Sequence, residues 1–388
     1  MAGTQLQTRR AFLEGAATSA VASLLPGCGT SVAGRGDSRE YRLVRAEGTH
    51  RELGRQHGEQ AAEHIRAHVD YIARTQKLNR RSLREKALRF KTLFEKHCPH
   101  LLEEMDGLSE GAGIQLAEAL AVNIRGELGQ VRDEACTAYA VSAKSAARGE
   151  VLIGQTSDML QPNIDVGYVL HLKPKNKPQV LMWTFGGMIG YHGMNSAGVA
   201  HFANALGGGP KDRFAMPHYP LKRMMLECAR SSEIVELFER IPLASNGNYV
   251  LCDGAGNILD IEATTEGPKF VRDEGTGFLV HTNHFLCAPY ATQENHDKSW
   301  RDSFPRLVRI HAMLEERLGS VTVQDLKNFL SDHSGYPTSI CRHARSGEDP
   351  EAASRTVAGI IAEPAQRRMH VALGNPCENR FVTYAMDS

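Results

Sequence analysis

The chain has 388 residues, of which 41% are hydrophobic and 23% are charged, as in an ordinary globular protein. Its 45 basic and 45 acidic side chains cancel, which argues against nucleic-acid binding, because that function needs a basic surface. The eight cysteines contain no CxxC pair, and no phosphate-binding glycine motif occurs. We therefore expect about two domains or one large one, with no cofactor, no metal and no nucleic-acid partner.

The amino-terminal 28 residues read as an export signal. Adjacent Arg9 and Arg10 precede a weakly apolar stretch that ends in Leu25–Cys28, and this order of basic, apolar and small residues is typical of a secretory signal. The arginine pair resembles a twin-arginine signal, and the Leu-Pro-Gly-Cys end resembles a bacterial lipobox, which would make Cys28 the lipidated residue. The alternative is a short amphipathic helix. Residues 29–40 are polar and Gly/Ser-rich, which predicts a flexible tether.

The next hundred residues are predominantly helical in pattern. Apolar residues recur at steps of three or four over 48–75, 82–108 and 113–128, which predicts three helical stretches. Pro99 is expected to break or kink the second stretch. We therefore treat residues 41–135 as one helical segment.

From Cys136 onward, the pattern changes to short strands separated by turn residues. Such runs mixed with helix pairs predict stacked layers of sheet and helix, and no internal repeat competes with this interpretation. Strands are expected at 137–143, 151–155, 167–173, 179–185, 199–203, 249–252, 258–262, 277–281, 356–362 and 369–374. Helices are expected at 220–240, 303–318 and 322–332.

Cys136 is the first candidate for catalysis, because it stands behind a small residue at the start of a strand. A nucleophile in that position suits a hydrolase that cuts its own chain and then uses the freed α-amine as the base for its thiol. The structural alternative is a buried cysteine that serves as a small hydrophobe. Asp158 ends the second strand of the same expected hairpin, so its carboxylate can return beside Cys136.

Three further segments that could carry chemistry lie downstream of Asp158. They are His281-Thr282-Asn283-His284, Asp302-Ser303-Phe304-Pro305-Arg306 and Tyr336-Pro337-Thr338-Ser339-Ile340-Cys341-Arg342. Together with the Cys-Thr start and the Gly-Gln-x-x-Asp hairpin end, they resemble the acyl-coenzyme A:6-aminopenicillanic acid acyltransferase family of N-terminal-nucleophile (Ntn) hydrolases. The resemblance extends from about residue 50 to residue 384.

The resemblance implies an α+β fold, a four-layer αββα sandwich, and a role for each matching residue. Cys136 would cut the Ala135–Cys136 bond and then act as the nucleophile, with residues 41–135 as the light chain and 136–388 as the heavy chain. Asp158 would help to arrange the nucleophile, and Asn283 would complete the oxyanion hole. Arg355, which follows a serine, would be the counterpart of the arginine in the family's pocket and would bind substrate. The alternatives are a turn cap for Asp158, a loop amide for Asn283 and a surface charge for Arg355.

Three other features favour structural interpretations. His281 and His284 lack the further ligands that a metal site needs. Ser196 lacks the glycine that a nucleophile elbow has two residues earlier. Cys341 and Cys377 are candidates for a disulfide in an oxidising compartment, although their spacing does not establish one.

The leading functional hypothesis is hydrolysis of a linear amide bond in an N-acyl compound through an acyl-enzyme. Export favours hydrolysis over transfer from acyl-coenzyme A, because that donor is cytosolic. The alternatives are an acyl-coenzyme A-dependent N-acyltransferase of the same fold and a non-catalytic exported lipoprotein that binds a ligand. We expect a bacterial cell to export the protein, which would be periplasmic or, through a lipid on Cys28, a membrane-anchored lipoprotein. We also expect the light and heavy chains to stay associated.

Overall fold

The computed structural model describes residues 40–129 and 135–387. The expected signal, its Cys28 and nearly all of the expected tether lie outside the described residues. Within the described residues, no helix is both long enough and apolar enough to cross a membrane.

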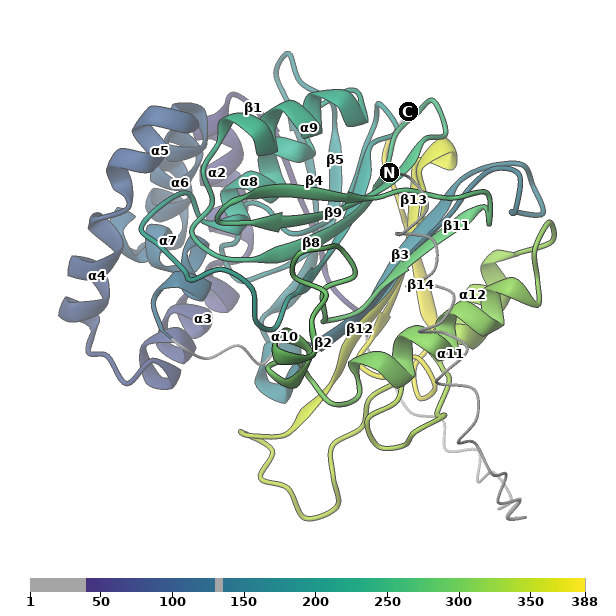
Figure 1. Ribbon diagram of the computed structural model, residues 1–388. Helices are drawn as coiled ribbons and strands as arrows, with labels where there is room; N and C mark the ends of the chain where they lie inside the picture. Colours follow the sequence, from purple (N-terminus) through teal and green to yellow (C-terminus); the bar gives the residue numbers. More distant parts are fainter. Residues whose placement is uncertain (1–39, 130–134, 388) are drawn as a thin grey trace. The chain divides into compact units, whose positions relative to one another are not determined.

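Two sheets form the centre of the unit that begins at Arg39 (Figure 1). The eight-stranded sheet has the order β1-β4-β5-β6-β7-β8-β9-β10. Its strands are β1 (Leu43–Gly48), β4 (Gly167–Pro174), β5 (Val180–Phe185), β6 (His192–Asn195), β7 (Ala200–Ala205), β8 (Gly247–Cys252), β9 (Ile258–Thr264) and β10 (Gly267–Val271). Every pair in it is antiparallel except β1 with β4, which is parallel.

The six-stranded sheet is antiparallel and has the order β11-β2-β3-β12-β13-β14. Its strands are β2 (Ala135–Val141), β3 (Leu152–Leu160), β11 (Phe278–His281), β12 (Ser354–Glu363), β13 (Arg368–Leu373) and β14 (Phe381–Ala385). Strands β2 and β3 pack against β7 of the eight-stranded sheet. The hairpin that carries Cys136 and Asp158 therefore faces the other sheet.

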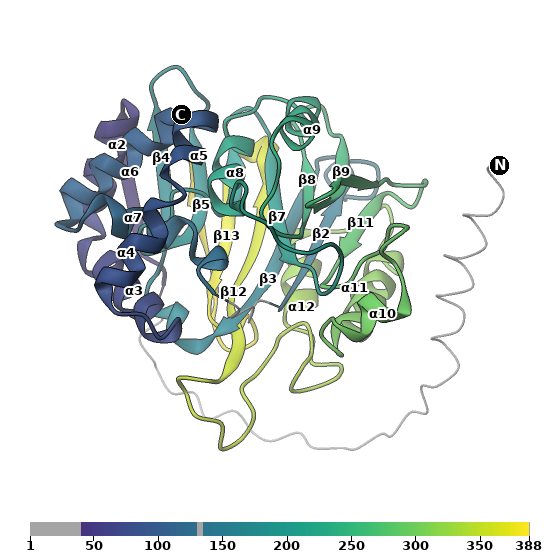
Figure 2. The ribbon, with the colours of Figure 1, turned by 60° about the vertical axis from the view of Figure 1, so that its left-hand side comes forward.

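Helices cover the outer faces of both sheets (Figures 1 and 2). Helices α2, α3 and α9 contact the eight-stranded sheet, and α11 and α12 contact the six-stranded sheet. The α-helices are α2 (His50–Gln60), α3 (Ala62–Thr75), α4 (Arg80–Leu88), α5 (Lys91–His97), α6 (Pro99–Ala112), α7 (Leu116–Asn123), α8 (His218–Met225), α9 (Ser231–Arg240), α10 (Gln293–Asp297), α11 (Ser303–Glu315) and α12 (Val323–Leu330). The order helix, sheet, sheet, helix confirms the predicted four-layer α+β sandwich.

The structure forms helices where the sequence predicts them, but some of the predicted helices are interrupted. The predicted helix over 48–75 is interrupted at Ala61, and the one over 220–240 ends at Met225 and restarts at Ser231. Pro99 is the first residue of α6, where its missing N–H costs nothing. The break at Pro99 is therefore confirmed.

The structure contains four short strands that the sequence pattern does not predict, namely β1, β6, β10 and β14. Strand β1 is the most consequential, because it places part of the predicted helical segment in the eight-stranded sheet. In its sequence Leu-Val-Arg-Ala-Glu-Gly, buried Val44 and Ala46 alternate with exposed Arg45 and Glu47, but the alternating stretch is only four residues long, and strands this short depend on their partners more than on their own residues.

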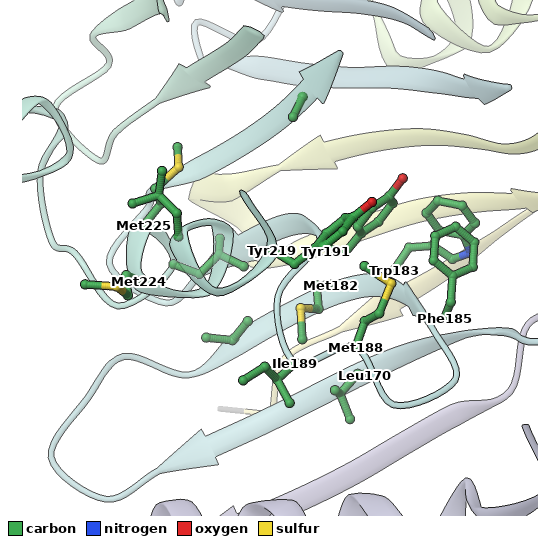
Figure 3. Close-up of a cluster of buried hydrophobic side chains, with 14 of the residues drawn as sticks. Leu170, Met182, Trp183, Phe185, Met188, Ile189, Tyr191, Tyr219, Met224 and Met225 are labelled. Atoms are coloured by element: carbon green, nitrogen blue, oxygen red, sulfur yellow. The ribbon is translucent and has the colours of Figure 1, made fainter. Parts of the chain in front are cut away.

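Aromatic and sulfur-containing side chains fill the core between α8 and strands β4 and β5 (Figure 3). Trp183 and Phe185 meet edge to face with ring centroids 4.7 Å apart, and Tyr191 lies 4.9 Å from Phe185. Edge-to-face pairs at this distance add stability beyond the area they bury. Tyr219 of this cluster also lines the pocket described below.

Helices α2 and α6 approach each other closely through paired glycines. A Cβ atom added to Gly54 would lie 1.8 Å from the carbonyl oxygen of Glu104, and one added to Gly107 would lie 2.1 Å from that of Arg51. Both obstacles are backbone atoms inside helices, so neither can move without displacing a whole turn. Side chains larger than hydrogen are therefore excluded at this crossing.

We expect Gly54→Ala to lower the free energy of unfolding by about 2–3 kcal/mol, because overpacking forces the two helices apart. Urea denaturation measures this change. Gly113→Ala is the control, since its Cβ would meet nothing within 4 Å and only its positive φ of 66° is strained, at about 1 kcal/mol. Equal losses in the two variants would contradict the close-packing explanation.

Candidate active site

The β2–β3 hairpin brings Cys136 and Asp158 to the same end of the six-stranded sheet. Antiparallel pairing sets Ala135 opposite Asp158 and Cys136 opposite Ser157. The Cys136 side chain is buried, with 1% of its surface exposed. The hairpin therefore places the Asp158 carboxylate beside the Ala135–Cys136 bond, as the sequence predicts.

Asn283 reaches the same bond from the segment that follows β11. Strand β11 pairs with β2, with His281 opposite Ala138, and the chain then turns back toward Cys136. The Cys136 backbone N–H donates to Asn283 Oδ1 at 3.1 Å. The Asn283 amide nitrogen donates to the Ala205 carbonyl at 3.0 Å, and the Asn283 backbone N–H donates to Ser303 Oγ at 2.8 Å. The side chain is thus fixed at both ends.

Arg306 from α11 is buried against the other side of Cys136. Its guanidinium donates to the Cys136 carbonyl at 2.6 Å, to Thr137 Oγ1 at 2.9 Å and to Asn283 Oδ1 at 2.7 Å. Because a guanidinium can only donate, these contacts also settle which end of the Asn283 amide is oxygen. Burial lowers the pKa of Arg306, although Asp302 and Asp158 counteract that effect.

Arg342 joins the two acidic residues of the site. Its Nε lies 3.3 Å from Asp158 Oδ2, and its terminal nitrogen contacts Asp302. Burial would lower the pKa of Arg342, but Asp158 and Asp302 together raise it. Burial also raises the pKa of Asp158, and Arg342 and Arg306 offset this only in part. Two aspartates and two arginines therefore form a charge-balanced group beneath the nucleophile.

A chain of polar side chains leads away from the Cys136 thiol. Gln155 Nε2 lies 4.0 Å from Sγ and 2.7 Å from His192 Nδ1. His192 Nε2 lies 3.4 Å from Lys222 Nζ, and burial lowers the His192 pKa far below its usual value. His192 is therefore neutral, and the chain connects the thiol with a buried lysine.

A pocket opens beside the Asn283 side of this centre. It is open to solvent. Asn204 and Ala205 line it, and the Ala205 carbonyl is the one that Asn283 contacts. Arg125 and Lys222 supply cations, while Tyr71, Ile72, Met159, Leu160 and Tyr219 supply apolar surface. Residues that precede the Ala135–Cys136 bond in the sequence and residues that follow it both line the pocket.

The remaining sequence candidates lie elsewhere or have structural partners. Arg355 is hydrogen-bonded to Asn375 and forms an ion pair with Glu378 at 2.9 Å, and it does not line the pocket. Its substrate-binding role stays a prediction.

Both histidines that flank Asn283 are buried. His281 bonds to Glu262 at 3.0 Å, and His284 bonds to Ser303 Oγ at 2.7 Å. The Ser196 hydroxyl accepts from the Gln179 backbone N–H at 3.0 Å. These contacts agree with the structural interpretations made from the sequence.

Sequence reasoning assigned no role to three residues of the site, namely Arg306 and Gln155 next to Cys136 and Arg342 next to Asp158. All three lie inside segments that carry the family resemblance. The spacing of Asp302 and Arg306 by four residues at the start of an expected helix could have indicated a pair, because such residues share one helix face.

Comparisons with known proteins agree with this arrangement. A family model described as acyl-coenzyme A:6-aminopenicillanic acid acyl-transferase matches residues 145–378. The acyl-coenzyme A:6-aminopenicillanic-acid-acyltransferase 40 kDa form of Emericella nidulans is 27% identical over 353 residues, which cover 88% of this chain and 95% of the relative.

Two solved structures are also similar to this chain. A mutant conjugated bile acid hydrolase from Clostridium perfringens has 13% identity and a TM-score of 0.45, with 64% of this chain and 97% of that one covered. Penicillin V acylase from Agrobacterium tumefaciens has 13% identity and a TM-score of 0.44, with 61% and 83% covered.

The sandwich and the family match define an enzyme of the Ntn-hydrolase and acyltransferase type. The matched region exceeds half of the chain, so the chain belongs to the acyl-coenzyme A:6-aminopenicillanic acid acyl-transferase family.

Proposed function

We propose that the chain cuts its own Ala135–Cys136 bond and then hydrolyses the amide bond of an N-acyl compound through an acyl-enzyme on Cys136. The observation that carries the proposal is the set of contacts around Cys136. Asn283 holds its nitrogen at 3.1 Å and Arg306 holds its carbonyl at 2.6 Å. A nucleophile fixed on both sides in a buried site has the preorganisation that acyl transfer requires.

In the first step, the Cys136 thiol attacks the Ala135 carbonyl carbon. The C–N bond to Cys136 breaks, the nitrogen takes up the thiol proton, and a thioester joins Ala135 to Sγ. Water then cleaves the thioester, which leaves a carboxylate on Ala135 and restores the thiol. The products are a light chain that ends at Ala135 and a heavy chain that begins with Cys136.

In turnover, the freed α-amine of Cys136 takes the thiol proton, because its ordinary pKa near 8 suits a base at neutral pH. The thiolate attacks the acyl carbonyl, and the amine product leaves with the proton. Water then releases the acid. Asn283 Oδ1 keeps the α-amine oriented, and the Asn283 amide nitrogen donates to the oxyanion. The Arg306 contacts support this orientation of Asn283.

The pocket beside Asn283 supports an N-acyl amide as the substrate. Its aromatic and aliphatic lining suits an apolar group, while Arg125, Glu127 and Lys222 in the lining suit a polar group. Residues of both proposed chains line the pocket, and β1 of the light chain pairs with β4 of the heavy chain. We therefore propose that the light and heavy chains stay associated after scission.

Acyl transfer from acyl-coenzyme A to an amine is the second candidate. It is favoured by the name of the Emericella nidulans relative, which aligns with 88% of this chain. The two activities share every step up to the acyl-enzyme and differ in whether water or an amine accepts the acyl group.

We also propose export of the protein by its amino-terminal signal and attachment to a membrane through a lipid on Cys28. Only the pattern of residues 1–28 supports this proposal. Export would favour water as the acceptor, because acyl-coenzyme A is a cytosolic compound.

Intact mass spectrometry of the purified wild-type chain tests self-cleavage. We expect two fragments that meet between Ala135 and Cys136, with a free α-amine on the heavy chain. Incubation of the same sample with N-acyl amino compounds, with and without acyl-coenzyme A and an amine, then separates hydrolysis from transfer. An uncut chain with no activity would refute the proposal and favour a ligand-binding protein.

Asn283→Ala is expected to lower kcat about 10²–10³-fold with little change in KM, because it removes a donor to the developing oxyanion. Asn283→Asp is the matched variant. Its carboxylate can still accept from Cys136 and Arg306, but it has no N–H to donate. Steady-state kinetics on the substrate found in the screen should show similar losses in both variants. Full activity of Asn283→Asp would contradict the donor role.

A further inference from the structure

Two cysteines and two histidines converge at the edge of the six-stranded sheet, outside the active site. They are His333, Cys341, His343 and Cys377, and each offers one ligand atom within 4.8 Å of the others. The sequence analysis anticipates no metal, because these residues are spread over 45 positions without a CxxC pair. The fold assembles them from two loops, one after α12 and one between β13 and β14.

Four of the six distances among the ligand atoms are close to the edges of a coordination tetrahedron, and all six are within 4.8 Å. The two Sγ atoms are 3.4 Å apart, and the two histidine Nε2 atoms are 3.1 Å apart. His343 Nε2 lies 3.7 Å from Cys341 Sγ and 3.3 Å from Cys377 Sγ. Zinc bound at ordinary lengths to two sulfurs and two nitrogens requires ligand–ligand distances of roughly 3.3–3.8 Å. Three of these four distances lie in that range and the Nε2–Nε2 distance is slightly shorter, so only a small shift of the histidines would let the side chains hold zinc.

Neighbouring groups orient these side chains as they do in metal sites. The other ring nitrogen of His343, Nδ1, lies 3.5 Å from a carboxylate oxygen of Glu378. The Asn375 amide donates to Cys341 Sγ at 3.3 Å, which suits a thiolate. Carboxylates on the far nitrogen of a ligating histidine, and donors to ligating sulfur, are the usual outer partners of bound metals.

We propose that these four residues bind one zinc ion as a closed, structural Cys₂His₂ site. Both cysteines would bind as thiolates and release their protons to solvent, and both histidines would bind through Nε2. Two thiolates and two imidazoles in a tetrahedron select zinc over the harder cations. Four protein ligands leave no open position for substrate, so the metal holds the structure and takes no part in the reaction.

The site would act on the enzyme through Arg342. Cys341 and His343 flank this residue, whose guanidinium contacts Asp158 and Asp302. Binding Cys341 and His343 to one ion fixes the backbone on both sides of Arg342. Cys377 would tie that short segment to the loop between β13 and β14, and His333 would tie it to the residues just after α12. The zinc would thereby stabilise the position of Arg342 in the charge group beneath Cys136.

The other His-containing group in the described residues makes a weaker case. His50, His100 and Glu227 also lie within 4.8 Å of one another. However, Arg223 lies 3.3 Å from a Glu227 carboxylate oxygen and already balances its charge. No thiolate takes part in that group.

Metal analysis of the full chain, purified under reducing conditions from zinc-supplemented cells, tests the proposal. We expect about one zinc per chain, and Cys377→Ser should lose most of it. Cys287→Ser is the matched control, because it removes a partly exposed cysteine outside the cluster. Metal-free wild type should take up Co²⁺ and show the visible bands of tetrahedral Co²⁺ with thiolate charge transfer.

Three outcomes would overturn the proposal. They are wild-type protein with little zinc and no Co²⁺ spectrum, equal zinc in Cys377→Ser and wild type, or a Cys341–Cys377 disulfide that persists under reduction. The same mass spectra report the Ala135–Cys136 bond. A failure of zinc binding is therefore distinguishable from a failure of self-cleavage.

Discussion

Cys136→Ala is expected to leave the chain uncut and to lower amide hydrolysis by about 10⁶-fold, the size of loss seen when a catalytic nucleophile is removed. Without the thiol, neither the thioester of self-cleavage nor the acyl-enzyme can form. Intact mass and an end-point amide assay measure the two effects on one preparation.

Cys252→Ala is the matched control for this experiment. Cys252 is also buried in a strand, and burial raises its pKa to about 12, so its thiol is inert. This variant should be cut and active. A Cys136→Ala chain that is still cut between residues 135 and 136 would exclude Cys136 as the agent of scission. Equal loss of activity in both variants would indicate a general packing defect.

Arg306→Ala is expected to lower the free energy of unfolding by about 3–5 kcal/mol, the usual effect of removing one partner from a buried ion pair. The change also removes the hydrogen bonds that Arg306 donates to the Cys136 carbonyl and to Asn283 Oδ1. Urea denaturation in the Cys136→Ala background keeps every sample uncut and measures stability alone. With Cys136 present, the variant should also cut itself more slowly, because one of the contacts that orient Asn283 is lost.

Arg309→Ala lies one turn further along α11 and serves as the control. Arg309 pairs with Asp332 at 2.7 Å, but its side chain is 43% exposed, and pairs of this kind contribute about 0–1 kcal/mol. A loss for Arg306→Ala no larger than that for Arg309→Ala would mean that the buried charge group contributes little to stability.

The part of the site that could be predicted from the sequence is the part built by neighbours in the chain. Cys136 and Asp158 belong to one hairpin, and the turn residues between them fix the register that sets Asp158 opposite Ala135. Local pairing of this kind is visible in the strand pattern. Asn283 was placed by the family resemblance and not by its own spacing, because 147 positions separate it from Cys136.

The charge group beneath Cys136 escaped prediction because tertiary packing alone assembles it. Arg306 and Arg342 lie 170 and 206 residues from Cys136, and the sequence analysis assigned neither of them a role, although both are buried in the structure. The sequence analysis placed a substrate-binding arginine at Arg355 instead, whose hydrogen bonds go to Asn375 and Glu378. Strand β1 was missed for a related reason, since its partner β4 lies more than a hundred residues away.

The parallel pairing of β1 with β4 sets an order of events in folding. The amino-terminal segment cannot complete its strand until residues 167–174 are available, and closing so long a loop is slow compared with forming the helices nearby. A chain cut between residues 135 and 136 before that contact forms would lose its first piece by diffusion. Under the proposed self-cleavage, the peptide bond at that position would have to outlast assembly of the eight-stranded sheet, so a slow scission step would be an advantage.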